Sequence, residues 1–573
     1  MNYSLIKPRD ENLSALEQVL FNRGINIELF DKFLHTTDDV IYDPKTIDRI
    51  QDGVKMLLSH IVAEHDILIQ VDSDCDGMTS AAVLINYLHR YFPNFVKSHI
   101  TYRFHEGKQH GIIFESVGDN IKLVIAPDAS SNDYEIHQKL AEKGIDVLVI
   151  DHHEADKISE YACVINNQLC DYPTKSLSGV GMVYKFCCYL DNFLGKPCAD
   201  DYLDLVALGM IADVMSLRDL ETKRLVEKGL TNLRNPFFKM MVDKNAFSLK
   251  GELTPEGVAW YIGPSVNAVL RFGEEPDKRI LFKAMLDFEA YKQIPSTKRG
   301  CKGQLETVVE QAVRNCTNLK NRQNDVRDEV QANLERLVEE QNLLQHKILV
   351  IKCEDSFNRN LTGLIANQLA AKFQRPTLLL NKVDNEWHGS GRSFNFEDFR
   401  DFCLASELTL YAQGHQGAFG IAFKDDATIN LFLDYCDSVL SNIEFKKEYK
   451  VDLIYDYGNF NGKDILDIAA LRKVWGKDVE EPWIVIENIK LNRDNFSLLS
   501  PDNKPTLKIN LPNGVSLIKF KSSEDEYESL YSENGCYVIN VVGKCNINEW
   551  CGRVTPQLII EEYEVIEKQN YYF

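Results

Sequence analysis

The chain has 573 residues, of which 44% are hydrophobic and 26% charged, the composition of a globular protein with about three or four domains. Its net charge of −22 excludes wholesale binding of a polyanion, because non-specific affinity for nucleic acid comes from lysine and arginine that neutralise phosphates. Any nucleic-acid site must be local or must use metal ions as its positive charge.

No segment is apolar over the length that a membrane-spanning helix needs, and residues 1–20 carry charges where a signal peptide would be apolar. The cysteines include no CxxC pair, so neither a zinc ribbon nor a disulfide framework is indicated. We therefore expect a cytoplasmic protein without membrane association, whose thiols are reduced and mostly buried.

From about residue 50 onward, short apolar runs alternate with amphipathic stretches, which predicts βαβ units and a parallel sheet. We expect helices over residues 78–92 and 131–144. The expected buried strands are residues 66–72, 121–128, 145–153 and 162–167. Three of these strands end in acidic residues. Ligands of open α/β sheets bind beyond the carboxyl ends of the strands, so these acids are expected to converge on one crevice.

Three aspartates, Asp72, Asp74 and Asp76, occupy alternate positions in DSDCDGMTS, directly after the first predicted strand. Like charges this close repel one another, so the arrangement is costly unless a cation, a positive partner or bulk water offsets the field. Exposure to solvent is the simplest alternative to a cation site.

Further candidates for metal binding follow later in the chain. Asp151, His152 and His153 come directly after an apolar strand, and carboxylate with imidazole is a ligand set for Mn²⁺, Mg²⁺ or Zn²⁺. Histidines that only form hydrogen bonds at a strand end are an equal alternative for this triplet alone. Asp213 is a lone carboxylate in an apolar helical stretch, and a buried carboxylate needs a partner such as a metal.

The second half of the chain changes character twice. Residues 301–341 contain no proline and repeat apolar residues at spacings of three and four, which predicts one amphipathic helix on the order of 60 Å long. A second α/β region follows it. From about residue 450 short β-like runs dominate, and five or so strands with little helix predict a small β-barrel, for which the OB-fold is a common form.

The motifs together resemble a known family. DSDCDGMTS, the strand end at Asp128, DHH and GMIADVMSL are similar to the four motifs of the DHH phosphoesterase superfamily, in the order and approximate spacing of the bacterial RecJ exonucleases. Beyond them, IGPSVNAVLRFGE resembles a RecJ stretch, GSGRS and QGHQGAFG resemble signatures of the DHHA1 domain, and NINEWCGRVTPQLIIEEYEV resembles the end of the RecJ OB domain. The ordered set is specific, although no single motif is.

The resemblance implies an α/β protein with a parallel-sheet DHH domain, a long connecting helix, a smaller α/β DHHA1 domain and a C-terminal OB-like β-barrel. The expected ranges are an N-terminal lead segment at 1–52, the DHH catalytic domain at 53–290, the connecting helix at 291–345, the DHHA1 domain at 346–447 and the OB-fold nucleic-acid-binding domain at 448–573.

The same resemblance implies two divalent metal ions, with Mn²⁺ expected before Mg²⁺. Such a pair clamps an in-line phosphoryl displacement, because one ion lowers the pKa of the attacking water and the other stabilises the leaving oxygen. Asp128 would bridge the ions. Asp151 and His153 would join it in the catalytic set by orienting ligands or contacting the substrate phosphate, with purely structural roles as the alternative. The expected metal residues are Asp72, Asp74, Asp76, Asp128, His152 and Asp213.

Residues expected to contact nucleic acid also follow from the resemblance. In GSGRS, glycines would let backbone N–H groups and Ser390 approach a phosphate while Arg392 binds it bidentately, and an ordinary polar turn is the alternative. Trp550 could stack on a base or belong to the core. The full set expected along the strand is Arg103, Asn267, Arg271, Ser390, Arg392 and His415.

Some positions depart from the family pattern. Gln70 stands where many DHH relatives have a histidine, which bears on the first metal site. Ser265 and Leu270 replace the usual arginine and glycine, and Phe419 occupies a small-residue position. These changes concern contacts with the nucleic-acid strand more than the hydrolytic centre.

The first functional hypothesis is a metal-dependent 5′-to-3′ exonuclease that hydrolyses single-stranded DNA to 5′-mononucleotides in repair, recombination or replication. The second is a DHH-DHHA1 phosphodiesterase of short RNA oligonucleotides or cyclic dinucleotides, and the third is a non-catalytic DNA-binding replication scaffold. The expected partner is single-stranded DNA, bound by a monomer. A helicase or a single-strand-binding protein stays open as a further partner.

Overall fold

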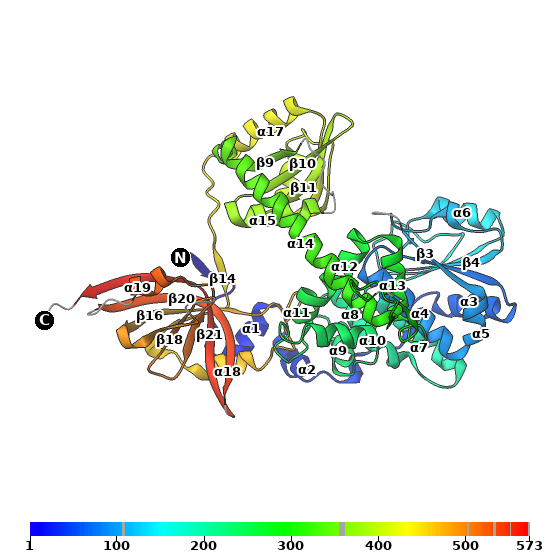
Figure 1. Ribbon diagram of the computed structural model, residues 1–573, viewed down its shortest axis with the longest axis horizontal. Helices are drawn as coiled ribbons and strands as arrows, with labels where there is room; N and C mark the ends of the chain where they lie inside the picture. The colour runs from blue at the N-terminus through cyan, green and yellow to red at the C-terminus, as the bar shows by residue number, and fades with distance from the viewer. Residues whose placement is uncertain are drawn as a thin grey trace. The chain divides into compact units, whose positions relative to one another are not determined.

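The computed structural model describes residues 1–105, 109–301, 303–353, 361–500, 504–530, 535–550 and 552–570 (Figure 1). The chain forms two compact units. The small unit holds Met1–Ser4 and Asn321–Lys450, and the large unit holds Leu5–Lys320 and Val451–Phe573. Among the described residues, no helix has both the length and the apolar character that crossing a membrane requires. The side chain of Trp550 lies outside the described part of the chain.

The large unit contains a five-stranded sheet in the order β3-β2-β4-β5-β6, with every neighbouring pair parallel. Its strands are β2 (Asp66–Val71), β3 (Ile100–Phe104), β4 (Ile121–Pro127), β5 (Asp146–Asp151) and β6 (Cys163–Asn166). Alternate residues face two hydrophobic cores: Ile67 and Ile69 belong to one, and Leu68 to the other. Because both faces are covered, the inner strands are continuous apolar runs.

The strand order reverses its direction between β2 and β4. The chain passes from β2 to β3 on one side of the sheet and then returns to β4 on the other side of β2. Connections that leave two neighbouring strands in opposite directions open a crevice at their carboxyl ends, and open α/β sheets bind ligands there. Asp72 follows β2 and Asp128 follows β4, so two of the predicted metal residues lie at this point.

Helices cover both faces of this sheet (Figure 1). Residues of α3, α4 and α7 share a core with one face, and α6 shares a core with the other. The predicted helix at 78–92 is α4, which begins three residues earlier because Asp74 caps it. The helices of this region are α3 (Ile50–Val62), α4 (Cys75–Tyr91), α5 (Pro93–His99), α6 (Tyr134–Glu142), α7 (Gly179–Leu194), α8 (Leu203–Ala212), α9 (Leu220–Thr231), α10 (Pro236–Lys244), α12 (Gly263–Phe272) and α13 (Glu275–Met285).

The connecting helix is shorter than predicted. Helix α14 spans Val308–Glu340, whereas the sequence pattern predicted a helix over 301–341. Residues Leu305–Thr307 instead form strand β8, which pairs with β7 (Gln293–Pro295). The helix starts where a capping box forms: the N–H of Glu310 donates to Thr307 Oγ1 at 3.3 Å, and the N–H of Thr307 donates to the Glu310 carboxylate at 2.7 Å. The expected range 291–345 therefore holds a hairpin as well as the helix.

The small unit is an α/β layer with the sheet order β12-β13-β11-β10-β9. Only β9 and β10 are parallel. One face packs on α15 and the end of α14, and the other packs on α16 and α17. Its elements are β9 (Leu349–Cys353), α15 (Thr362–Phe373), β10 (Thr377–Val383), β11 (Glu386–Arg392), α16 (Phe399–Ala405), β12 (Tyr411–His415), β13 (Ala418–Phe423) and α17 (Asp426–Val439).

The C-terminal part of the large unit is a seven-stranded sheet in the order β15-β16-β20-β21-β19-β18-β17. It has two strands, β15 and β17, beyond the five predicted from apolar runs. Register shifts interrupt β16 and β20, and such bulges let long strands bend. The elements are β15 (Leu453–Asp456), α18 (Gly462–Ala469), β16 (Trp483–Asn492), β17 (Phe496–Leu499), β18 (Thr506–Asn510), β19 (Ser516–Lys519), α19 (Glu524–Leu530), β20 (Gly535–Trp550) and β21 (Arg553–Asn570).

The N-terminal segment joins the two parts of the large unit. After α1 (Ala15–Asn22), the buried guanidinium of Arg23 donates to both carboxylate oxygens of Asp452, at 2.7 and 3.0 Å. Farther along, the N–H of Tyr42 donates to Glu221, a buried carboxylate that also pairs with Lys185. The segment is therefore tied to the C-terminal sheet at one point and to the parallel-sheet part at another.

Candidate metal centre

The alternating aspartates are positioned by the turn from β2 into α4. Asp72 and Asp76 are buried, and Oδ1 of Asp74 accepts the N–H of Gly77 at 3.0 Å as the cap of α4. A Cβ added at Gly77 would lie 2.5 Å from the Cβ of Asp72. The glycine of the motif therefore lets the helix start directly against the strand end and bring the three carboxylates together.

Asp128 occupies an unusual backbone conformation after β4. Its φ is +69°, in the left-handed region that few non-glycine residues adopt, and Ser130 follows at +85°. The N–H of Asp128 donates to the carbonyl of Ile150 at 2.8 Å, which holds the turn in place. A Cβ added at Gly179, the first residue of α7, would overlap the Asp128 carboxylate. The side chain of Asp128 thus lies directly under the start of α7.

All six predicted metal residues lie in one region. His152 links two of the aspartates. Its Nε2 lies 3.2 Å from Asp128 Oδ1 and 3.4 Å from Asp213 Oδ2. Asp128 thus adjoins both a set of aspartates and the set that contains His152. The sets whose ligand atoms lie within 4.8 Å of one another are Asp72, Asp74 and Asp128; Asp76, His152 and Asp213; and Asp128, Asp151, His152 and His153.

Burial and like charges perturb several groups of this centre. Burial, and then neighbouring Asp76, raise the pKa of Asp128 well above its usual range. Burial and the nearby aspartates likewise raise the pKa of Asp213 to about 8, and burial lowers the pKa of His152. Within the described residues, Oδ2 of Asp76, Oδ1 of Asp128 and Nε2 of His152 are buried without a hydrogen-bond partner. Buried carboxylate oxygens and an unprotonated imidazole nitrogen fit divalent cations such as Mn²⁺ or Mg²⁺.

Asp151 organises the turn that carries the two histidines. Its Oδ1 accepts the N–H of His152 at 2.7 Å and lies 2.7 Å from His153 Nδ1, while Oδ2 accepts the N–H of Ser131 at 3.0 Å. Burial alone would raise the pKa of Asp151, but the contacts with His153 outweigh it and lower that pKa to about 2. The same hydrogen bond raises the pKa of His153 to about 9. His153 is therefore positively charged at neutral pH, and 57% of its side chain is exposed.

Several groups at the centre were not predicted. Nδ1 of His105 and Nδ1 of His110 lie 3.1 and 3.0 Å from the Asp72 carboxylate. Both histidines follow Arg103 closely in the sequence, and only Arg103 was predicted to have a role. Gln70, at the position where DHH relatives carry histidine, donates to the carbonyl of Arg103 at 3.2 Å. Imidazole groups therefore do reach Asp72, but from the segment after β3.

Ser178 also contacts one of the predicted metal residues, Asp76. Its hydroxyl donates to Asp76 Oδ1 at 2.7 Å, and the N–H of Val180 reaches the same oxygen at 3.2 Å. The sequence offered no signal for this contact, because Ser178 lies about a hundred residues after Asp76 and outside every motif.

Asn267 is one of the residues of the large unit that were predicted to contact the DNA strand, and it lies against the DSDCDGMTS motif. Its Oδ1 accepts the N–H of Cys75, between Asp74 and Asp76, at 3.1 Å. Arg103 is exposed on the edge strand β3, and Arg271 is exposed in the last turn of α12.

Residues 389–392 of the GSGRS motif lie in strand β11 of the small unit, so the polar-turn alternative is wrong. Its glycines serve close packing: a Cβ at Gly389 would overlap the carbonyl of Leu379, and one at Gly391 would lie 2.5 Å from the ring of Phe419. Phe419, which departs from the family pattern, thus fills the space that Gly391 leaves.

Arg392, at the end of β11, is the partly buried cation of this motif. Its Nη1 donates to the carbonyl of Gly391 at 2.7 Å, and its guanidinium lies against Gly363. Burial lowers the pKa of Arg392, and within the described residues no carboxylate lies within ion-pair distance of it. Ser390 lies on the same strand, and His415 is exposed at the end of β12.

Comparison with known proteins decides the family. The matching family descriptions are "DHH family, N-terminal domain" over residues 66–210 and "RecJ OB domain" over residues 451–562. YorK of the SPbeta prophage in Bacillus subtilis strain 168, named as a single-strand DNA-specific exonuclease, is 34% identical over 580 residues, covering 100% of this chain and 99% of its own. The chain belongs to the RecJ family.

More distant relatives agree in name and fold. The single-stranded-DNA-specific exonuclease RecJ of Bacillus subtilis is 26% identical over 99% of this chain and 71% of its own. The crystal structure of RecJ from Thermus thermophilus in complex with Mn²⁺ has a TM-score of 0.71 at 19% identity, covering 99% of this chain and 79% of that one. Its complex with Mg²⁺ has a TM-score of 0.66. These matches confirm the predicted fold class and the predicted resemblance.

Proposed function

We propose that this RecJ-family chain is a metal-dependent exonuclease that hydrolyses single-stranded DNA from the 5′ end to 5′-mononucleotides. The observation that carries the proposal is the meeting of two ligand sets at Asp128, at the carboxyl ends of β2 and β4. Bound there, two divalent ions would supply a water of lowered pKa and positive charge for the leaving oxygen. The names of the relatives support the substrate class.

The protein's own groups would align the phosphodiester. Asp151 accepts from Nδ1 of His153, so Nε2 of this charged and half-exposed imidazolium is left to donate to a phosphate oxygen. Asn267 fixes the backbone between Asp74 and Asp76, so it would keep two ligands in place rather than contact the strand. Arg103 and Arg271 remain proposed contacts of the DNA backbone.

The proposed 5′ polarity depends on Arg392. A partly buried guanidinium without a carboxylate partner in the described residues suits a terminal phosphate, which it can bind through two parallel hydrogen bonds. Ser390 and His415 are proposed neighbours of the same end of the strand. The C-terminal sheet is proposed to bind bases farther along the DNA. We propose that the protein acts as a monomer. Because its proposed substrate is single-stranded DNA, a helicase or a single-strand-binding protein is a proposed partner.

The proposal is tested by incubating the purified protein with Mn²⁺ or Mg²⁺ and single strands labelled at either end. Mononucleotides are expected to appear first from the 5′ label, and EDTA is expected to abolish their release. Preferential hydrolysis of RNA dinucleotides or cyclic dinucleotides would favour the phosphodiesterase hypothesis. Binding of DNA without hydrolysis under every metal condition would favour the scaffold hypothesis.

A further inference from the structure

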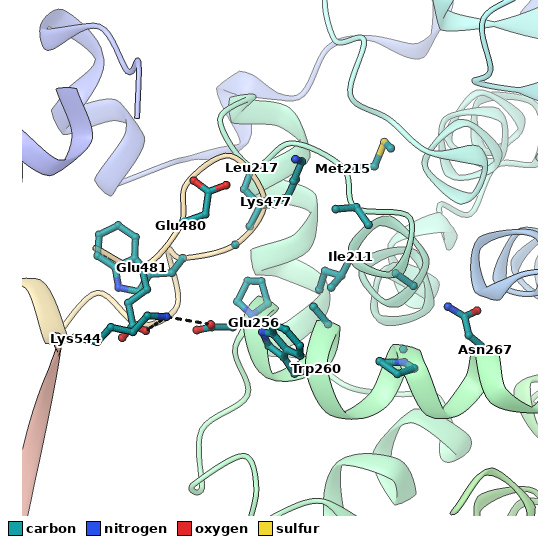
Figure 2. Close-up of a pocket in the computed structure, with 18 of the residues that line it drawn as sticks. Ile211, Met215, Leu217, Glu256, Trp260, Asn267, Lys477, Glu480, Glu481 and Lys544 are labelled. Carbon is teal, nitrogen blue, oxygen red and sulfur yellow. Dashed lines mark ion pairs between the residues drawn. The ribbon is translucent and has the colours of Figure 1, made fainter. Parts of the chain in front are cut away.

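A pocket of about 540 Å³ lies within the large unit, between the helical segments after α8 and the C-terminal part of the chain (Figure 2). One wall carries Met215 and Trp260, and the opposite wall carries Lys477, Glu481 and Lys544. Its volume is in the range of pockets that hold small organic groups.

The most exposed aromatic group of this pocket is Trp260. It lies in a π-helical turn, Val258–Ile262, between the short helix α11 (Pro255–Gly257) and α12. Such turns are rare and frequently occur at functional sites. The indole is 69% exposed, and within the described part of the chain no aromatic ring or cation stacks on it. A large apolar ring left in water at a pocket mouth is a surface available to a flat partner.

Two residues that line the pocket adjoin the metal centre. Val214, which lines it, directly follows Asp213 and is 56% exposed. Its φ is +61°, a strained conformation for a β-branched residue that persists only where the surroundings impose it. Asn267 lines the pocket too, and it binds the N–H of Cys75 among the metal aspartates. The pocket wall is therefore tied to the metal residues by one peptide bond at Val214 and by one hydrogen bond at Asn267.

The charges of the pocket favour a neutral ring over a phosphate. Lys544 Nζ lies 2.9 Å from Glu481 and 3.9 Å from Glu256, the pairs drawn as dashed lines in Figure 2. Lys477 Nζ lies 3.2 Å from Asp478. Each lysine is thus paired with a carboxylate, so neither offers a free charge to a phosphate. The apolar walls and carboxylate acceptors instead suit the face and the amino groups of a nucleobase.

We propose that this pocket is a nucleobase subsite, in which Trp260 stacks on one base of the strand whose phosphodiester is being hydrolysed. The assignment rests on the proposed exonuclease function and adds a defined contact to it. Stacking on an aromatic side chain is sequence-tolerant, because every base has a π face. The subsite would hold the strand in register over the metals without selecting a sequence.

The test is a scan with an abasic nucleotide. Single strands that lack one base, at successive positions from the 5′ end, are hydrolysed by wild type, Trp260→Ala and Trp260→Phe. At one position near the scissile bond, the missing base should slow wild type and Trp260→Phe by about tenfold. Trp260→Ala should be slow on the intact strand and insensitive to the same missing base. Phe247→Ala, which removes a 97% exposed ring outside the pocket, serves as the matched control and should behave as wild type.

A binding measurement separates this inference from the proposed function. In EDTA, binding of oligothymidylate should quench part of the tryptophan fluorescence of wild type, and Trp260→Phe should lose that part. The subsite would be overturned if Trp260→Ala responded to every abasic position as wild type does and Trp260→Phe kept the full quenching. The proposed exonuclease function would be unaffected by that result. Absence of hydrolysis by wild type would instead overturn the proposed function, whereas the quenching would still report on the pocket.

Discussion

At the residue scale, the left-handed backbone of Asp128 decides which substitution is informative. Alanine at φ +69° adds backbone strain, whereas asparagine tolerates this region. Asp128→Asn should therefore keep the fold while removing a charge from the meeting point of the two ligand sets. We expect hydrolysis to fall by at least about a hundredfold, as for other lost metal-site groups. Rates with Mn²⁺ check this, and circular dichroism verifies the fold. Near-normal activity would remove Asp128 from the centre.

Gly179 offers a test that changes no charge. A Cβ at this position would overlap the carboxylate of Asp128, so Gly179→Ala should displace that side chain and lower the hydrolysis rate by at least about tenfold. Gly181→Ala is the control on the same helix. Its added Cβ would lie 3.2 Å from Leu177, a much milder contact than the overlap between a Cβ at Gly179 and Asp128. Equal rates for the two variants would show that the position of Asp128 under α7 does not matter.

Arg392→Ala tests recognition of the strand end. If this arginine binds the terminal phosphate, its loss should cost about 2 to 4 kcal/mol of transition-state stabilisation on 5′-phosphorylated strands. Strands with a 5′ hydroxyl should be affected much less, because the contact is absent there. Arg400→Ala, which removes an arginine paired with Asp401 at 2.9 Å, is the control and should preserve the preference. If Arg392→Ala were slowed equally on both substrates, Arg392 would be a general contact of the DNA backbone and not a contact of the strand end.

The proposed metal residues could be predicted from the sequence because they stand in recognisable motifs at or near the ends of strands and helices. His105, His110 and Ser178 were not, because only the folded chain brings them to Asp72 and Asp76. A histidine or serine far from a motif carries no local signal of the carboxylate that it will contact. The same limit explains why the hydrogen bond between Asn267 and the N–H of Cys75 was not predicted.

At the element scale, buried strands and helices with long apolar runs were predicted, and elements defined by packing were not. Strand β3 was missed because, at the sheet edge, it exposes Thr101 and Arg103 and so lacks a continuous apolar run. The start of α14 was misplaced because apolar spacing continues back to Leu305, while the capping box at Thr307 fixes the helix start. The polar turn considered as an alternative for GSGRS is a strand, in which the glycines allow close packing.

The ion pair between Arg23 and Asp452 holds the N-terminal segment against the C-terminal part of the large unit. Both side chains are buried, and Asp452 also accepts from Asn22 at 3.0 Å. Arg23→Ala would leave an unpaired buried carboxylate and should lower the free energy of unfolding by about 3 to 5 kcal/mol. Arg23→Met with Asp452→Asn, which removes both charges and keeps an oxygen that can accept from Asn22, should restore most of it. Denaturant unfolding checks this, and equal stability of Arg23→Ala and wild type would contradict a buried ion pair.

At the scale of the whole molecule, the C-terminal sheet is part of the large unit and not a detachable module. One hydrophobic cluster contains residues of the parallel sheet, of α1 and of the C-terminal sheet, such as Ile67, Val19 and Ile486. Removal of residues 451–573 would expose this shared apolar surface. Substitutions such as Trp260→Ala are therefore better probes of strand binding than truncation.

Anomalous diffraction from crystals grown with Mn²⁺ would show directly whether two divalent ions bind at Asp128. We expect two peaks at the Asp128 carboxylate, one bounded by Asp72 and Asp74 and the other by Asp76, His152 and Asp213. Asp128→Asn should lose or weaken both peaks. Well-ordered Mn²⁺ elsewhere, with none among these side chains, would rule out a two-metal centre at Asp128.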